Sequence, residues 1–510
     1  MGEFLSNKRE SALRVLSKSK LLAFRQCPKR LWLEVHRPDL REDSSATQAS
    51  FTVGHQVGDI ARQVYDPKGK GALIDFKVGG FEAAFARTQA LLQVNQPIFE
   101  AGFRAEGALA FADVMLPVKR GKRAWRMVEV KSSTSVKDYH RDDAAVQAFL
   151  ARSSGVPLAG IALAHIDSSW VYPGGGDYSG LLVENDLTNE AFSRETEVRS
   201  WIDESHGIVA KKKEPRVSTG EQCSAPYECG FFSYCQGQEP QVQQPLHWLP
   251  GAQSRGLKAH VEAHGVCELR DVPDALLSEK QRRVKAVTLT GKTYFDKDSA
   301  LRELAQHKLP AFFMDFETIQ FAVPIWKGTR PYQQIPFQFS VHRLARTGKL
   351  EQLAFLDLSG GDPSKAFAEA LLSACGERGP IFVYNAGFEM ARIRDLAQRF
   401  PRLSEALLAL NERVVDLLPV AREHYYHPSQ QGSWSIKAVL PALCPDLKYG
   451  DLDGVQDGGM AMEAFLEAIS PQTSAARKAE IEQQLLAYCA LDTYAMVRLW
   501  AAFSNSSLKI

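Results

Sequence analysis

The chain has 510 residues, of which 45% are hydrophobic and 24% charged, an ordinary globular composition with room for two or three domains. Its 61 basic and 60 acidic residues give a net charge of +1, which excludes a uniformly basic surface and restricts nucleic-acid binding to local patches. An apolar stretch long enough to cross a bilayer and the apolar core of a signal peptide are both missing, so we expect a cytoplasmic protein with no membrane partner.

Four cysteines flank the N-terminal half of the chain. Cys27 lies near the start, and Cys223, Cys229 and Cys235 follow with five residues between neighbours. Without an export signal a disulfide framework is not expected. Four thiolates complete the ligand set of an iron–sulfur cluster or of a zinc ion. Because the close Cys-x-x-Cys pairs typical of structural zinc are absent, the spacing favours a 4Fe–4S cluster, with zinc as the alternative occupant.

A charged hairpin pattern lies between these cysteines. Residues 111–116 and 125–131 are predicted to form two neighbouring strands joined by a basic turn. Glu129 and Lys131 are two residues apart in a strand and therefore share a face, where Asp113 of the neighbouring strand can meet them. Two acids can hold a divalent metal, and the lysine can contact a scissile phosphate or the attacking water.

The order Asp, Glu-Val-Lys and then Gln147 in a helical stretch resembles the PD-(D/E)XK nucleases of the RecB type. The cysteines, one before and three after, are similar to those of the iron–sulfur members, including CRISPR-associated RecB-like exonucleases. The resemblance covers roughly residues 15–240 and implies a restriction-endonuclease-like domain at 1–240. It further implies Mg or Mn bound by Asp113 and Glu129, a catalytic Lys131, a supporting Gln147, and a 4Fe–4S cluster on Cys27, Cys223, Cys229 and Cys235.

Two positions depart from this family. Gly58 stands where the RecB pattern often has a metal-binding histidine, and His55 lies almost one helical turn earlier. His55 can either substitute from the same helix face or be a surface residue. Ala151 stands where the family usually has a tyrosine, four residues after Gln147.

Residues 241–310 are expected to connect two domains. Prolines and glycines open this segment, and two short helical stretches follow. The helical pair can be a spacer, or it can grip DNA phosphates as a helix–hairpin–helix does.

The C-terminal part alternates apolar runs with helical stretches, which predicts an α/β sheet covered by helices. The expected strands are 311–316, 336–343, 353–357 and 381–384, and the expected helices are 363–375, 387–399, 403–411 and 474–504.

Three acidic strings stand out in this part. Asp315 and Glu317 share one face of a strand, and Tyr488 and Asp492 share one face of a helix. Glu389 follows an apolar strand, where α/β sheets place functional groups. Four carboxylates gathered in one site can hold two Mg²⁺ or Mn²⁺ ions about 4 Å apart, the arrangement that cleaves phosphodiesters.

The order Asp-x-Glu, Asn-x-x-Phe-Glu and Tyr-x-x-x-Asp resembles the DnaQ-like 3′→5′ exonucleases of the DEDDy type, over roughly residues 310–510. The resemblance implies a ribonuclease H-like domain at 311–510. It implies two Mg or Mn ions on Asp315, Glu317, Glu389 and Asp492, with Tyr488 orienting the attacking water. Glu389 stands where the family usually has aspartate.

Neighbouring residues allow two interpretations each. Asp416 follows an apolar pair and either supports this site or caps a helix or strand end. Tyr425, Tyr426 and Trp434 either stack on bases or belong to the core, and Lys437 either meets a phosphate or packs as a cap residue.

Together the two resemblances imply an α/β enzyme, a metal-dependent DNA exonuclease with two nuclease-like domains, of which the C-terminal one works 3′→5′ on single-stranded or frayed ends. DNA is favoured over RNA as the partner, in repair, mobile-element processing or phage defence, with protein partners left open. The alternatives are an RNA exonuclease and a nucleic-acid-binding subunit with partly degenerate nuclease sites.

Overall fold

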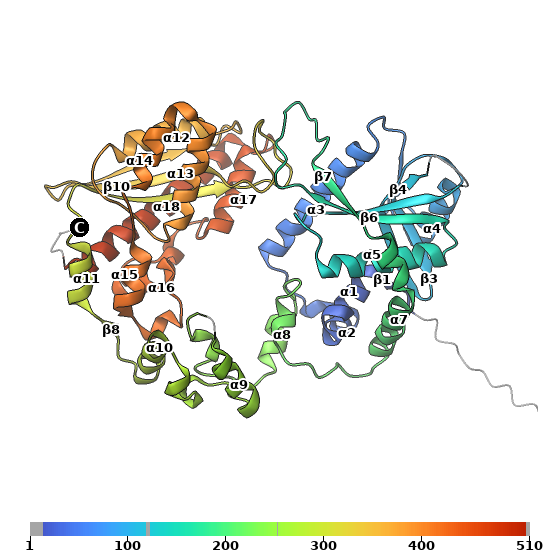
Figure 1. Cartoon of the computed structure of the whole chain (residues 1–510), viewed down its shortest axis with the longest axis horizontal. Coiled ribbons are helices and arrows are strands. Elements are labelled where there is room, and N and C mark those ends of the chain that lie inside the picture. The colour runs from blue at the N-terminus through green and yellow to red at the C-terminus, as the bar shows by residue number, and fades with distance from the viewer. Residues whose placement is uncertain (1–13, 119–122, 252, 506–510) are drawn as a thin grey trace, which may run out of the picture. The chain divides into compact units, whose positions relative to one another are not determined.

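The computed structural model describes residues 14–118, 123–251 and 253–505, and it divides into two compact units (Figure 1). Unit 1 comprises residues 1–240 and 321–332, and unit 2 comprises 241–320 and 333–510. The segment expected to connect two domains therefore belongs to unit 2. The basic turn expected near residue 120 lies at 119–122, outside the described residues. Within the described ranges, no helix is long and apolar enough to cross a membrane.

Unit 1 is built on a mixed seven-stranded sheet with the order β2-β3-β4-β5-β6-β7, to which β1 adds by pairing with β4. The central hairpin of β4 and β5 is antiparallel, whereas β5 and β6 run parallel. The strands are β1 (Leu16–Ser17), β2 (Ala72–Leu73), β3 (Ile98–Ala105), β4 (Ala108–Pro117), β5 (Trp125–Lys131), β6 (Leu158–Ile166) and β7 (Leu182–Asp186).

Helices cover both faces of this sheet. The buried helix α5 packs with Trp125 and Met127 of β5 on one face, which is the face that Glu129 shares by strand alternation. Helix α3 packs with Ile166, and with Ala322 and Val323 of the later segment, on another part of the unit. The helices are α1 (Lys18–Gln26), α2 (Pro28–His36), α3 (Ser45–Tyr65), α4 (Gly80–Leu91), α5 (Asp138–Ser153), α6 (Thr188–Ser193), α7 (Glu195–Val209) and α8 (Phe232–Gly237).

Unit 2 contains a second mixed sheet, with the order β11-β10-β9-β12-β13. Strand β9 lies at its centre, antiparallel to β10 and parallel to β12. The strands are β9 (Ala311–Ile319), β10 (Ile335–Leu344), β11 (Leu350–Leu356), β12 (Ile381–Val383) and β13 (Val414–Asp416), and β8 (Tyr294–Phe295) pairs separately with β14 (Tyr425–Tyr426). The protein is thus a mixed α/β protein with two mixed sheets.

Alternation along β9 assigns its side chains to two layers. Phe312, Met314 and Phe316 pack with α12, α13 and α14, whereas Phe313 packs against Trp500 of α18. Asp315 and Glu317 therefore point to the α18 side. The helices are α9 (Arg255–His264), α10 (Glu279–Thr290), α11 (Lys297–Leu304), α12 (Ser364–Cys375), α13 (Gly387–Arg399), α14 (Ser404–Asn411), α15 (Leu417–His424), α16 (Ile436–Leu443), α17 (Gly458–Ile469) and α18 (Ala475–Phe503).

The segment 241–310 packs tightly into unit 2. Gly432 has a positive φ of 84°, and a Cβ atom placed there would lie 2.2 Å from the carbonyl oxygen of Trp248. Arg283 of α10 also donates to the carbonyl of Glu423, at 2.6 Å. This segment is therefore a structural part of the unit that carries the C-terminal acids.

Candidate functional site

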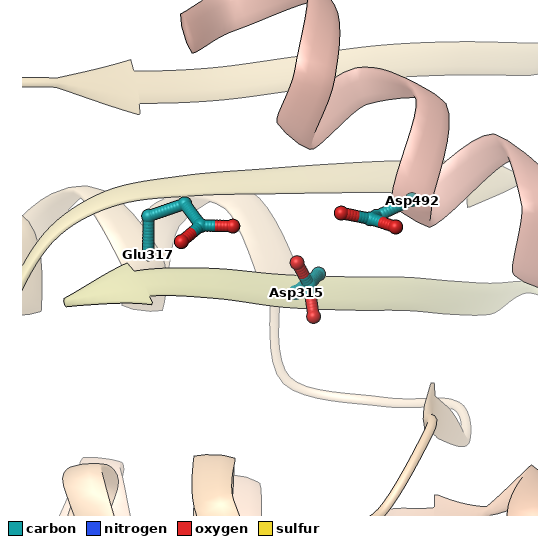
Figure 2. Close-up of side chains that lie close together, drawn as sticks. All are labelled: Asp315, Glu317 and Asp492. Carbon is teal, nitrogen blue, oxygen red and sulfur yellow. The ribbon is translucent and has the colours of Figure 1, made fainter. Parts of the chain in front are cut away.

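Three of the predicted acids meet in unit 2. Carboxylate oxygens of Asp315 and Glu317 on β9 and of Asp492 on α18 all lie within 4.8 Å of one another. Figure 2 shows the strand and the helix presenting these three groups to a common space. Glu317 and Asp492 are buried and Asp315 is half-buried. Residues 175 or more positions apart in the chain are thus brought together by the packing of α18 on β9.

Glu389 lies in the first turn of α13 and lines the same pocket as these three acids. Its side chain is buried, and within the described chain its Oε2 atom has no hydrogen-bond partner. A buried carboxylate oxygen without a donor is costly unless a cation reaches it. The fourth acid therefore adds an unsatisfied oxygen to the wall of the cluster's pocket.

Asp416 both caps a helix and holds the loop before Glu389. Its Oδ1 accepts from the backbone nitrogens of Leu418 and Asn385, each at 2.9 Å, and its Oδ2 accepts from Ala386 at 3.1 Å. Asn385 has a positive φ of 76°, so this carboxylate stabilises a strained turn. Both interpretations of Asp416 hold together.

Two tyrosines and a lysine lie close to these acids. The hydroxyl of Tyr449 donates to Asp492 Oδ1 at 2.5 Å, and Tyr488 lies beside Asp492 on α18 and lines the pocket. The Lys437 ammonium lies 5.0 Å from the ring centre of Tyr449 and 5.2 Å from that of Tyr488. Lys437 also lines the pocket, and it is the cationic residue among the described residues that do so.

The pKa values of the four acids are raised, because the carboxyl groups are buried close together. Burial, followed by the charge of Asp492, raises the pKa of Glu317 to about 8, and burial raises that of Glu389 to about 8. Burial and the charges of Asp492 and Glu317 raise the pKa of Asp315 well above its usual range. Burial also raises the pKa of Asp492, against the hydrogen bond from Tyr449.

These shifts indicate which kind of ligand suits the pocket. Buried carboxylates that repel one another are stabilised when a divalent cation joins them, and an all-oxygen donor set suits Mg²⁺ or Mn²⁺. The residues present therefore fit the expected metal at this position.

The aromatic residues after Asp416 are buried, and Trp434 also lines a cavity of unit 2. Tyr425, Tyr426 and Trp434 are all buried, and the Trp434 indole donates to the Tyr425 carbonyl at 2.9 Å. Of the four residues considered in this stretch, Lys437 is the one that lines the acid pocket.

In unit 1, Glu129 and Lys131 meet as strand alternation predicts. Lys131 Nζ lies 2.7 Å from Glu129 Oε1 and 2.5 Å from Asp143 Oδ2. Lys18 Nζ contacts the same two acids, at 2.8 Å from Glu129 and 2.9 Å from Asp143. Two lysines and two acids thus form one nearly buried network on the α5 face of β5.

The other predicted residues adjoin this network. Gln147 donates to Glu129 Oε2, and Asp113 Oδ2 accepts from the backbone nitrogen of Val130 at 2.7 Å. Burial and the charge of Asp113 raise the pKa of Glu129 to about 7. Burial alone would raise the pKa of Asp143. The ammonium groups of Lys131 and Lys18 outweigh burial, so the pKa of Asp143 is lowered.

The two positions that depart from the RecB pattern are a buried alanine and a glycine with open space beside it. His55 is exposed on α3, which favours the interpretation as a surface residue. Ala151 is fully buried on α5. A Cβ atom at Gly58 would meet nothing within 4 Å, so this position has room for a side chain.

The four predicted cysteines surround one small pocket. Cys27 starts α2, Cys235 lies in α8, and Cys223 and Cys229 lie in the loop between α7 and α8, where Cys229 donates its backbone nitrogen to the Cys223 carbonyl at 2.8 Å. Burial raises the thiol pKa of Cys229 and of Cys235. The donor set of four thiols suits a metal cluster or a zinc ion.

The four thiols line one pocket, so they can serve as a single donor set for either occupant, an iron–sulfur cluster or a zinc ion.

Sequence reasoning missed three residues of these sites. Asp143 had a usable signal, because it lies one turn before Gln147 on the same helix face. Lys18 had no such signal, since its contact with Glu129 spans 111 residues. Tyr449 likewise reaches Asp492 across 43 residues from a short irregular segment.

A family model and a solved structure each match part of the chain. A family model described as a domain of unknown function, DUF2779, matches residues 312–435, which include Asp315, Glu317 and Glu389. No curated protein matches the chain. A solved structure titled "Crystal structure of SSO0001" is 12% identical, with a TM-score of 0.24, over 46% of this chain and 90% of that chain. A TM-score this low gives no ground for assigning a shared fold.

Proposed function

We propose that unit 2 is a metal-dependent exonuclease domain of the DnaQ-like, ribonuclease H-like kind, acting 3′→5′ on single-stranded or frayed ends. The observation that carries this proposal is the meeting of Asp315, Glu317 and Asp492 within 4.8 Å, beside the unsatisfied oxygen of Glu389. Two of the acids lie on the central strand of a mixed five-stranded sheet, and the third lies on the helix that covers it. Surface acids would repel one another into water rather than gather in a buried pocket.

The residues have separate tasks in this proposal. Asp315, Glu317, Glu389 and Asp492 would hold two Mg or Mn ions, which would supply charge neutralisation at the phosphate and a lowered pKa for water. The hydroxyl of Tyr488, on the same helix face as Asp492, orients the attacking water.

The remaining groups of the pocket set its geometry and charge. Tyr449 fixes the rotamer of Asp492 by its hydrogen bond, and Asp416 holds the turn that delivers Glu389. Lys437 lines the pocket with a positive charge, which would stabilise the negative charge that develops on the leaving oxygen of the nucleic acid.

For unit 1 we propose a PD-(D/E)XK nuclease-like domain with a 4Fe–4S cluster. Asp113 and Glu129 would hold Mg or Mn, Lys131 would contact the phosphate or the attacking water, and Gln147 would orient Glu129. The network supports this assignment, since the acid, the lysine and the glutamine meet on one face of β5. The pocket lined by Cys27, Cys223, Cys229 and Cys235 supports a bound cluster at this place.

One observation favours a second function for unit 1. Lys18 and Lys131 both contact Glu129 Oε1, so the acid is already neutralised by two ammonium groups. With Gly58 at the histidine position, this arrangement also suits a domain that holds nucleic acid without cutting it.

The test is a time course on end-labelled single- and double-stranded DNA, with matched RNA strands, in Mg²⁺ and in Mn²⁺. We expect 3′ trimming of single-stranded DNA by the wild-type protein, and loss of trimming in Asp315→Ala and in Asp492→Ala. Lys131→Ala should remove any separate activity of unit 1 and leave 3′ trimming intact. Trimming that persists in both acid variants contradicts the proposal, and preferential loss of the RNA strand assigns RNA as the substrate.

A further inference from the structure

A second cavity adjoins the acid pocket of unit 2. It has a volume of about 1000 Å³ and is lined by residues of the 250–281 segment, by Arg422 and by the 432–436 segment. Tyr384, Asn385 and Ile436 line both this cavity and the acid pocket, so the two spaces are neighbours with a common wall. A volume at the upper end of the small-ligand range has room for more than one nucleotide.

The charge of this cavity is opposite to that of its neighbour. Arg422 and Lys280 line it, and none of its lining residues in the described chain is acidic. Lys280 pairs with Glu423 at 2.5 Å, whereas the exposed Arg422 guanidinium makes no hydrogen bond or ion pair to other described residues. Arg422 lies near enough to Tyr384 to lower the pKa of its hydroxyl, against a larger rise caused by burial.

The starts of three helices add to this character. Ser254, Ser278 and Ser435 are the N-caps of α9, α10 and α16, and all three line the cavity. Backbone N–H groups at helix starts favour anions. The hydroxyl oxygens of Ser254 and Ser278 accept from backbone nitrogens of their helices, whereas that of Ser435 makes no cap bond and accepts from the Ser433 hydroxyl at 3.2 Å. The Ser435 hydroxyl proton can be donated to a ligand.

We propose that this cavity holds the phosphates of the single strand that lead to the terminal nucleotide in the acid pocket. The inference rests on the proposed function of unit 2 and assigns a substrate-binding role to the 241–310 segment. A strand whose last phosphodiester lies among four acids needs its preceding phosphates held by cations and amide groups. The cavity supplies these groups directly beside the acid pocket.

The test measures binding rather than cleavage. Fluorescence anisotropy with a labelled single-stranded DNA, and with the same RNA sequence, is recorded in EDTA at several salt concentrations. Arg422→Ala should weaken binding at least about fivefold at low salt and reduce the slope of log K against log salt by about 0.7, the value for one phosphate contact on a single strand. Arg402→Ala, at an exposed arginine on the turn before α14, is the matched control and should bind as the wild type does.

A second variant keeps the test independent of a single side chain. Aspartate is a favoured residue at a helix N-cap, so α16 should keep its stability in Ser435→Asp, but the variant adds a negative charge to the cavity. It should weaken strand binding at least about fivefold at an unchanged melting temperature. Unchanged affinity and salt slope in both variants overturns the inference, as does an equal loss in the Arg402→Ala control.

The outcomes separate this inference from the proposed function. If the wild type trims DNA while both cavity variants bind normally, the cavity assignment fails and the nuclease proposal survives. If the wild type cuts neither DNA nor RNA while the variants bind weakly, the nuclease proposal fails and the cavity assignment survives.

Discussion

The substitution Glu317→Gln should stabilise the metal-free protein at high pH. The pKa of Glu317 rises from 4.5 to about 8 on folding because the side chain is buried and lies beside Asp492. At about 1.4 kcal/mol for each pH unit, this rise corresponds to about 5 kcal/mol. The folded state keeps a proton that the unfolded state releases, so the wild type loses this stability as the pH rises from about 4.5 to about 8.

The glutamine variant cannot ionise and should not lose that stability. Urea unfolding in EDTA should therefore show similar free energies for the two proteins near pH 4.5 and an advantage of about 5 kcal/mol for Glu317→Gln above pH 8. Each kcal/mol of this advantage should raise the melting temperature of the variant by about 2–4 °C. Added Mn²⁺ should stabilise the wild type at high pH and reduce the advantage, because the cation replaces the proton.

The matched control is Glu482→Gln, at an exposed position of α18. Its carboxylate lies in water, so the variant should follow the wild type at every pH. A pH-independent difference between Glu317→Gln and wild type, or the same pH dependence in Glu482→Gln, would refute the argument that crowded buried acids prepare this pocket for a cation.

Three further substitutions have defined outcomes. Gly432→Ala should lower the free energy of unfolding by more than about 2 kcal/mol in urea melts, because its Cβ would lie 2.2 Å from the Trp248 carbonyl at a positive φ; an unchanged midpoint would show that the 241–310 segment is not held there. Gly58→Ala, in the middle of α3 with open space around it, should raise stability by about 0.5–1 kcal/mol, and a loss of stability would mean that the position is packed. Cys229→Ser should remove the visible absorbance and most of the iron of anaerobically purified protein, whereas a colourless wild type with stoichiometric zinc would contradict the cluster assignment.

Local patterns predicted the elements of unit 2 well. The helix expected at 387–399 has those bounds, and the last helix, expected at 474–504, runs over 475–503. Alternation along β9 correctly placed Asp315 and Glu317 on one face, because strand periodicity is fixed by the backbone. The strand expected at 381–384 is β12, and the acid expected after it, Glu389, is buried in the pocket.

Contacts between distant segments were beyond prediction from periodicity. Lys18 reaches Glu129, and Tyr449 reaches Asp492, through packing that no local pattern encodes. Residues 321–332 belong to unit 1, and periodicity could not predict this either. Ala322 and Val323 are apolar residues whose burial partners are set by the tertiary fold. Residues 241–310 were expected to form a separate connector, because their prolines suggest a linker. They are instead part of unit 2.

The most direct test of the account is an anomalous difference map from crystals of the protein soaked in Mn²⁺. The account predicts manganese peaks in the pocket of Asp315, Glu317 and Asp492, with carboxylate oxygens at about 2.1 Å from the ions. A map with manganese bound elsewhere and none among these acids, at a pH where they are ionised, would contradict it.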